Sequence, residues 1–281
     1  MIARVGLTLT FVQPAKTNSN NMKDRYNLNL FYSGEENAPK YLDAQEITSA
    51  VFTARALRIN TLVMDFPVDV TLQQRKQIEE RWIKLLPQLE QVTTLSCRHK
   101  VNQTFFEAIC KMKNLEHLHF WTSTVEDLSS ISRLKKLRRL EMESFSRLVD
   151  ISPILMLKNL EVLSIESSFK VDNYDLLGQM TALIGLRLGG NSFSPKNLRL
   201  KSLKPFFNLK HLKHLDLSSS SVIDNSYETI LELNSLERFD IAILIPQSIR
   251  QSIKANHKKL KAGFFMDYDF DNKEFYDGKE W

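Results

Sequence analysis

One short apolar pattern recurs along the chain and constrains its fold more than any other feature. The pattern is Leu-x-x-Leu-x-Leu, with other apolar residues in place of some leucines, and successive copies start 22 to 29 residues apart. Seven good copies begin at Val92, Leu115, Leu137, Leu160, Leu183, Leu212 and Leu236. Weaker copies are "INTLVM" (59–64) and "LKAGFF" (260–265). A repeat of this length indicates a stacked array, in which each unit buries its apolar residues against its neighbours.

The spacing of apolar residues changes within each copy, which indicates two kinds of local structure. The Leu-x-Leu part alternates, as in a strand that turns every second side chain inward. The Leu-x-x-Leu part fits bends and short helical turns that close each coil. Each buried leucine contributes about 1.5–3 kcal/mol, so several per coil can offset the entropy lost on ordering it.

The motif resembles that of the leucine-rich repeat family over roughly residues 56–266. The short units resemble the 22-residue class of internalins, as "TVEDLSSISRLKKLRRLEM" (124–142) illustrates. The resemblance implies an α/β solenoid of about nine coils, a curved right-handed arc. A parallel sheet would line its concave side, and short helices and 3-10 turns would lie on the convex side.

The sequence departs from the family at the position after each motif where asparagine is usual. Only Asn191 conforms, and the equivalent positions hold Ser123, Phe145, Ser168, Ser220 and Leu244. Serine can supply part of the missing hydrogen bonding, whereas phenylalanine and leucine cannot. We therefore expect an irregular ladder of hydrogen bonds between coils.

Residues 1–55 lack the motif and are expected to form an N-terminal α/β cap over the first coil. Alternation predicts strands at 5–11 and 26–32, and "YLDAQEITSAVFTARAL" (41–57) is interpreted as a helix. Residues 267–281 form an acidic, aromatic tail, interpreted as a second cap with Phe264, Phe265, Tyr268 and Phe270 on the last coil. Asp267, Asp269 and Asp271 alternate as in a calcium loop, but the required glycine and glutamate are missing.

Three segments between the strands have their own patterns. Thr71 can cap a helix that continues through Ile78 and Trp82 to Leu86, and 102–112 predicts a shorter helix. Residues 192–206 form an insertion with two prolines, interpreted as a protruding loop.

The residues between the inward leucines should line the concave wall and contact a partner. Parallel strands lie about 4.8 Å apart, so residues at equivalent positions should form columns across the wall. One column would hold His119, Glu141, Ser164, Arg187, Asp216 and Asp240. The candidate partner-binding residues are His117, His119, Trp121, Arg139, Glu141, Glu143, Glu166, Arg187, His214, Asp216, Arg238 and Asp240.

Individual wall residues leave alternatives open. Trp121 fits an interface anchor and equally fits packing against Glu143 or the rim. His117, His119 and Glu141 could converge on a metal ion, but the sequence supplies no fourth ligand, so we expect an exposed polar wall with no metal and no cofactor.

Composition limits the classes of partner. The net charge of +5 is mild, and lysines gather just before the strands, as in "MKN", "LKK" and "LKH". This flank is interpreted as solvated, with a nucleic-acid track or a site for an acidic protein as alternatives. The two cysteines, Cys97 and Cys110, are interpreted as reduced structural thiols rather than a redox pair. No apolar run is long enough to cross a bilayer, and the N-terminus does not fit a signal peptide, so we expect a cytoplasmic protein.

These observations favour a non-enzymatic, monomeric module that binds a protein partner and neither nucleic acid nor membrane. Free-standing repeats of this family resemble inhibitors such as ribonuclease inhibitor, and the internalin-like class suggests a bacterial source. An inhibitor or toxin-neutralising immunity protein is therefore one specific hypothesis. The alternative is an adaptor or regulatory subunit of a signalling or ligase complex, and an enzyme is a third class, for which no catalytic motif is found.

Overall fold

The structure is a computed structural model that describes residues 31, 39–61, 69–190, 196–241, 245–269 and 274–275. The strands predicted at 5–11 and 26–32 lie outside the described residues, apart from Phe31. So do Asn191 and Leu244 of the asparagine position, and Phe270 and Asp271 of the tail.

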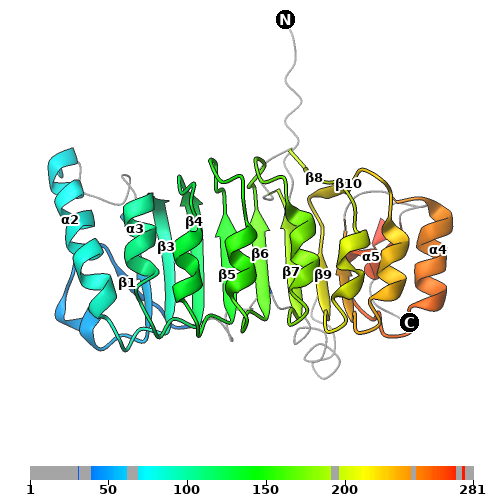
Figure 1. Cartoon of the computed structure of the whole chain (residues 1–281), viewed down its shortest axis with the longest axis horizontal. Coiled ribbons are helices and arrows are strands. Elements are labelled where there is room, and N and C mark those ends of the chain that lie inside the picture. Colours follow the sequence, from blue (N-terminus) through cyan, green and yellow to red (C-terminus); the bar gives the residue numbers. More distant parts are fainter. Residues whose placement is uncertain are drawn as a thin grey trace, which may run out of the picture.

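A parallel sheet extends along the molecule, with its strands side by side in chain order (Figure 1). Within the described residues this sheet has nine strands, and β8 and β10 belong to a separate small sheet. They are β1 (Leu42–Ala44), β2 (Ala56–Ile59), β3 (Thr94–Val101), β4 (His117–Ser123), β5 (Arg139–Glu143), β6 (Val162–Glu166), β7 (Gly185–Gly189), β9 (His214–Asp216) and β11 (Arg238–Asp240). Two small pairs lie beside it, β8 (Leu198–Leu200) with β10 (Ser220–Val222), and β12 (Tyr268–Asp269) with β13 (Glu274–Phe275).

A helical segment follows most strands, and these segments stack alongside the sheet (Figure 1). The α-helices are α2 (Leu72–Leu85), α3 (Gln103–Ile109), α4 (Gln247–Asn256) and α5 (Phe264–Asp267). The 3-10 helices are η1 (Ser49–Phe52), η3 (Leu86–Gln88), η4 (Ser129–Arg133), η5 (Ser152–Met156), η6 (Tyr174–Gln179), η7 (Lys204–Asn208) and η8 (Tyr227–Glu232). Thr71 caps α2 as predicted: its hydroxyl oxygen accepts the backbone N–H of Gln74, and the Gln74 side-chain oxygen accepts the backbone N–H of Thr71. The predicted shorter helix is confirmed as α3, capped by Asn102.

The inward residues of the motif form continuous rows across the strands. One row, in register from strand to strand, is Leu57, Leu95, Leu118, Leu140, Leu163, Leu186, Leu215 and Phe239. Every member is at most 1% exposed. The repeat therefore builds one core that runs through all coils, as the period predicted.

The N-terminal part of the prediction needs two corrections. The segment 41–57 is not a helix, since it contains β1, η1 and the start of β2. Leu42 and Leu57 pair in register, so the sheet begins upstream of residue 56. The weak copy "INTLVM" was also placed in the wrong register, because Leu57 and Ile59 are the residues that align with Leu95 and Cys97.

The insertion after β7 folds back onto the next coil instead of only protruding. Its described part contains β8, which pairs with β10. Gly190 allows this return, because a Cβ there would lie 2.4 Å from the carbonyl oxygen of Lys196. The backbone can come so close only where no side chain stands.

Serines replace the expected asparagines, as predicted. Ser123 Oγ donates to the carbonyl of Val101 at 3.0 Å and accepts the N–H of Val125 at 3.0 Å. Phe145 makes no such side-chain bond and instead packs on Phe120, with ring centroids 5.6 Å apart. Its side chain thus adds to the core, while its backbone N–H still donates to Ser168 Oγ of the next coil at 3.3 Å.

The remaining predictions concern the ends and the thiols. Phe265 is fully buried, and its ring lies 5.2 Å from that of Phe239 in the last sheet strand. Cys97 and Cys110 are free and buried, and burial raises the pKa of the Cys110 thiol to about 12. Among the described residues, no helix is both long and apolar enough to cross a bilayer.

Candidate functional site: the polar face of the sheet

The sheet face turned away from the helical segments, which we call the wall, carries the candidate residues. Strand alternation sends the leucines into the core and the residues between them onto the wall. The predicted column is confirmed, since the register pairs His119 with Glu141, Glu141 with Ser164, and so on through Arg187 and Asp216 to Asp240. Equivalent residues of successive coils are therefore neighbours across the whole wall.

Burial divides the wall into two parts. The open part, on β4 and β5, consists of His117, His119, Trp121, Arg139, Glu141 and Glu143. None of these six is buried. The covered part, on β6 to β11, consists of Val162, Ser164, Glu166, Gly185, Arg187, His214, Asp216, Arg238 and Asp240. His214 there is fully buried, and the Arg187 side chain is only 13% exposed.

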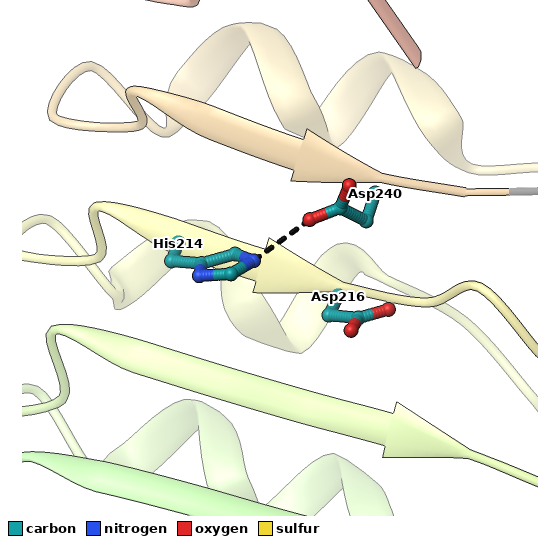
Figure 2. Close-up of side chains that lie close together, drawn as sticks. All are labelled: His214, Asp216 and Asp240. Carbon is teal, nitrogen blue, oxygen red and sulfur yellow. Dashed lines mark hydrogen bonds and ion pairs between the residues drawn. The ribbon is translucent and has the colours of Figure 1, made fainter. Parts of the chain in front are cut away.

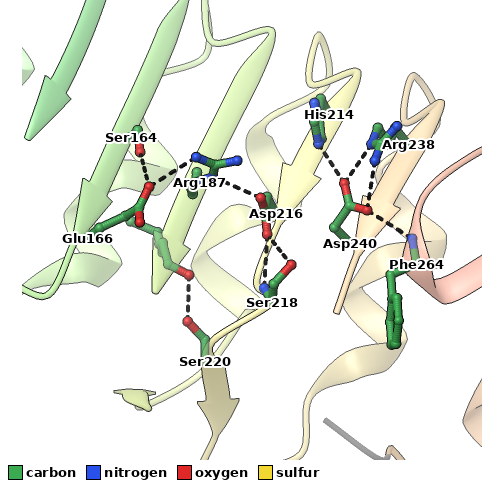
Figure 3. A network of polar contacts seen from close by, with 11 residues as sticks. Ser164, Glu166, Arg187, His214, Asp216, Ser218, Ser220, Arg238, Asp240 and Phe264 are labelled. Carbon is green, nitrogen blue, oxygen red and sulfur yellow. Dashed lines mark hydrogen bonds and ion pairs between the residues drawn. The ribbon is translucent and has the colours of Figure 1, made fainter. Parts of the chain in front are cut away.

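Arg187 connects three strands of the covered part (Figure 3). Its Nη1 lies 3.0 Å from Glu166 Oε1 on β6, and its Nε lies 2.8 Å from Asp216 Oδ2 on β9. The other Asp216 oxygen accepts the backbone N–H and the hydroxyl of Ser218, at 2.9 and 2.6 Å. One guanidinium thus holds two nearly buried carboxylates on either side of β7, which fixes its own orientation.

Asp240 is the centre of a second group of contacts (Figures 2 and 3). It bonds His214 Nε2 at 2.8 Å and Arg238 Nε at 2.6 Å, and it accepts the backbone N–H of Phe264 at 2.8 Å. Burial alone would raise its pKa, but the bonds from His214 and Arg238 and their charges lower the pKa of Asp240 to about 2. Asp240 therefore stays ionised and locks the His214 ring.

Among the described residues, the cluster whose geometry could hold a metal ion is His214, Asp216 and Asp240, with ligand atoms within 4.8 Å of one another (Figure 2). Arg187 and Arg238 already contact the two carboxylates. A cation would have to displace these guanidinium groups, so we interpret the cluster as a network of ion pairs and not as a metal site.

The trio considered for a metal from the sequence has other partners. His119 Nε2 lies 2.9 Å from Glu143 Oε1, and its Nδ1 lies 3.2 Å from Ser96 Oγ. Glu141 pairs with Arg139 at 2.5 Å. Both nitrogens of His119 are therefore used within the wall, and the structure does not bring the trio together around one point.

Trp121 lies in the open part and is 36% exposed. The Arg98 guanidinium carbon stands 4.0 Å from the centroid of the Trp121 ring, at cation–π distance. The His119 ring lies 6.4 Å from it. Trp121 is thus held in place on one face while part of it remains accessible.

Phe31 is a wall contact that sequence reasoning missed. Its ring lies 4.7 Å from the His214 ring, edge to face, and 4.7 Å from the Arg187 guanidinium carbon. Phe31 is 7% exposed. Nothing in the repeat pattern pointed to this contact, because Phe31 lies upstream of all copies; the signal available was the pair of glycines at wall positions of β7.

The lysine flank predicted from the sequence lies where the strands begin. Lys136, Lys158 and Lys213 border a shallow hollow of about 690 Å³ there. Acidic residues share it, and Arg138 pairs with Glu161 at 2.7 Å. The flank is therefore exposed and mixed in charge, with a basic excess.

Comparison with known proteins supports the fold. A leucine-rich repeat protein of Leptospira interrogans is similar over 78% of this chain and 51% of its own, with 22% identity and a TM-score of 0.53. An internalin of Listeria monocytogenes is similar over 63% of this chain and 48% of its own, with 18% identity and a TM-score of 0.50. The chain thus spans about half the length of these structures. The sequence matches no protein-family model and no curated protein.

Proposed function

We propose that this leucine-rich repeat solenoid is a protein-binding module that uses the open part of the wall. The observation that supports this most is the state of Trp121, an aromatic side chain fixed by Arg98 yet 36% exposed. Tryptophan and arginine are the residue types that most often dominate binding energy at protein interfaces.

Preorganisation of the wall supports the same proposal. Its charged groups are already paired within or between neighbouring strands, as in Arg139 with Glu141 and His119 with Glu143. Because these side chains are held before a partner arrives, little conformational entropy remains to be lost on binding. A preformed wall can therefore bury a standard interface of about 1,600 Å² without folding.

The charge of the open part indicates the chemistry of the partner surface. Arg139 and Glu141 carry opposite charges side by side, and the Glu143 carboxylate is bonded to the His119 ring, so these groups of the open part create no strong single-sign field. We propose a folded protein with a mixed polar surface and an apolar patch to receive Trp121. Nucleic acid and membrane are not proposed as partners, because the described residues of the wall include no row of unpaired basic groups.

The finer hypothesis is a monomeric, cytoplasmic inhibitor or immunity protein of bacterial origin that blocks a toxin with its wall. The bacterial source of the two similar structures supports the origin. An adaptor or regulatory subunit of a larger complex is the alternative. The two differ in partner number, since an inhibitor should bind one protein tightly and an adaptor several.

Site-specific photocrosslinking tests the proposal directly. Benzoylphenylalanine replaces His117, which is half-buried in the open part, or Phe207, which is 48% exposed on η7 as a matched control. We expect a partner to be crosslinked from position 117 and not from 207. Crosslinking from 207 alone would remove the wall from the proposal.

Substitution then measures the contribution of the anchor. Trp121→Ala should weaken binding of the crosslinked partner by about 30-fold or more, since a central aromatic anchor is worth roughly 2 kcal/mol or more. Phe207→Ala serves as the control and should leave the affinity unchanged. Equal affinities of wild type and Trp121→Ala would contradict the anchor role.

A further inference from the structure

One row of the wall has a gap in its middle. The row runs through His117, Arg139, Val162, Gly185, His214 and Arg238, one residue on each strand. Gly185 stands between Val162 and His214, and it has no side chain to fill its place. The row therefore lacks a side chain at this position of the covered part, which we call the recess.

Phe31 lies at this recess. Its ring contacts the ring of His214, on the strand beside Gly185, and the guanidinium of Arg187, two residues further along β7. The burial of the surroundings agrees with an occupied recess. Val162 faces the wall and is yet only 7% exposed, and His214 is fully buried.

Both groups that contact Phe31 are held by others. Arg187 is fixed between Glu166 and Asp216, and the His214 ring is fixed by Asp240 (Figure 3). The two carboxylates balance the charge of the guanidinium while its flat face stays available for stacking. An aromatic ring placed there gains cation–π and edge-to-face contacts without reorganising the wall.

We propose that the recess bounded by Gly185, Arg187 and His214 is a recognition pocket for an aromatic side chain of the protein partner, and that Phe31 occupies it in the partner's absence. The assignment to a partner rests on the proposed function of the wall. Binding would then exchange Phe31 for a partner aromatic residue, in addition to the contact at Trp121. Aliphatic side chains fit less well, since they offer no π face to the guanidinium.

A small aromatic probe tests the pocket without a partner. N-acetyl-L-phenylalaninamide is titrated into the full chain and into Phe31→Ala, with ¹H–¹⁵N NMR as readout. We expect Phe31→Ala to bind with a dissociation constant on the order of 1 mM. Wild type should bind at least tenfold more weakly because Phe31 competes, and N-acetyl-L-leucinamide should bind Phe31→Ala at least tenfold more weakly than the aromatic probe.

The location is tested in the Phe31→Ala background. Gly185→Val fills the gap and should abolish probe binding, whereas His117→Ala, in the same row on β4, should preserve it. Binding that survives Gly185→Val, or that is absent in a folded Phe31→Ala, would overturn the pocket. Equal probe binding by wild type and Phe31→Ala would overturn the role of Phe31.

A second measurement uses the unaltered wall, in case Phe31→Ala does not fold. The chain is labelled with 4-fluorophenylalanine, and the ¹⁹F signal of Phe31 is assigned by its loss in Phe31→Leu. Excess probe should move this signal toward the position of a solvated ring. A signal that stays in place at a probe concentration of 50 mM contradicts displacement.

The pocket and the proposed function can fail separately. If crosslinking from position 117 captures a partner but the probe does not bind, the pocket proposal is rejected, while the proposal that the wall is an interface is retained. If the probe binds but no partner crosslinks to the wall, the proposed function and the assignment of the pocket to a partner are both rejected. The recess then binds only Phe31 of the same chain.

Discussion

At the scale of single residues, the buried polar groups decide how the protein responds to pH and to substitution. His99 is an inward residue of β3, only 4% exposed, with its ring edge-on against Phe105 at 4.7 Å. Burial lowers the pKa of His99 to about 4, below its ordinary value of about 6.5. Its ring is therefore neutral in the folded protein at every pH above about 4.

This burial predicts a loss of stability in mild acid. As pH falls from about 6.5 to 4, the unfolded chain takes up a proton at His99 that the folded chain excludes. The free energy of unfolding should therefore fall over this window, by about 3 kcal/mol from this residue. Urea unfolding at a series of pH values measures it, and His99→Leu should show a correspondingly flatter profile. Parallel profiles of the two proteins would contradict the assignment.

Two aspartates that each pair with an arginine should differ in importance because they differ in exposure. Asp240 is 4% exposed and pairs with Arg238 and His214. Asp240→Asn leaves these partners without a counter-charge, and the free energy of unfolding should drop by about 3 kcal/mol.

The exposed pair supplies the control for this comparison. The Asp43 side chain, which pairs with Arg58, is 62% exposed, so Asp43→Asn should cost less than about 1 kcal/mol. Urea unfolding at pH 7 compares the two variants. A similar cost for both would mean that the Asp240 contacts contribute no more than a surface ion pair.

At the scale of elements, the repeat unit was predictable because its signal is periodic. Each strand of the nine-stranded sheet from β3 to β11 begins within a recognised motif, since the inward leucines impose the register. The first two strands were missed because only a short 3-10 helix separates β1 from β2, and no motif spacing marks them. Sequence reasoning interpreted 41–57 as a helix, whereas Leu42 and Leu57 instead lie side by side in the sheet.

Neighbouring glycines at the end of β7 offer a test of the close backbone return at β8. A Cβ on Gly190 would lie 2.4 Å from the Lys196 carbonyl oxygen, so Gly190→Ala must displace the backbone. A Cβ on Gly189 would meet Ser219 at 3.4 Å, an ordinary contact. Thermal unfolding should show a lower Tm for Gly190→Ala, by about 5 °C or more if the cost exceeds about 2 kcal/mol. Gly189→Ala should stay close to wild type, and equal Tm values would refute the constraint at Gly190.

At the scale of the whole molecule, the fold could be predicted and the state of the wall could not. The columns follow from strand register alone, so the neighbours of Arg187 were foreseeable. The division into an open and a covered part was not, and the contacts of Phe31 with His214 and Arg187 illustrate why, since Phe31 lies far from β7 in sequence. A contact made by a residue outside the repeats leaves no trace in the repeat pattern.

Because each coil contacts only its neighbours, damage at one end should remain local. Phe265→Ala removes the ring that packs on Phe239 of β11. Hydrogen exchange should become faster in β9 and β11, by about 100-fold if the local cost is near 3 kcal/mol. The amides of β3 and β4 serve as an internal reference and should exchange at their wild-type rates. Uniform acceleration along the sheet would show that the molecule opens as a single unit.

The contacts of Arg187 restrict how a molecule of this kind can change its length. Glu166, Arg187 and Asp216 come from three successive sheet strands, and Arg187 forms an ion pair with the strand on either side of its own. Duplication or deletion of a repeat unit at this point would leave one of these nearly buried charged side chains without its counter-charge. We therefore expect repeat units to be gained or lost in evolution near the two ends of the array and not around β7.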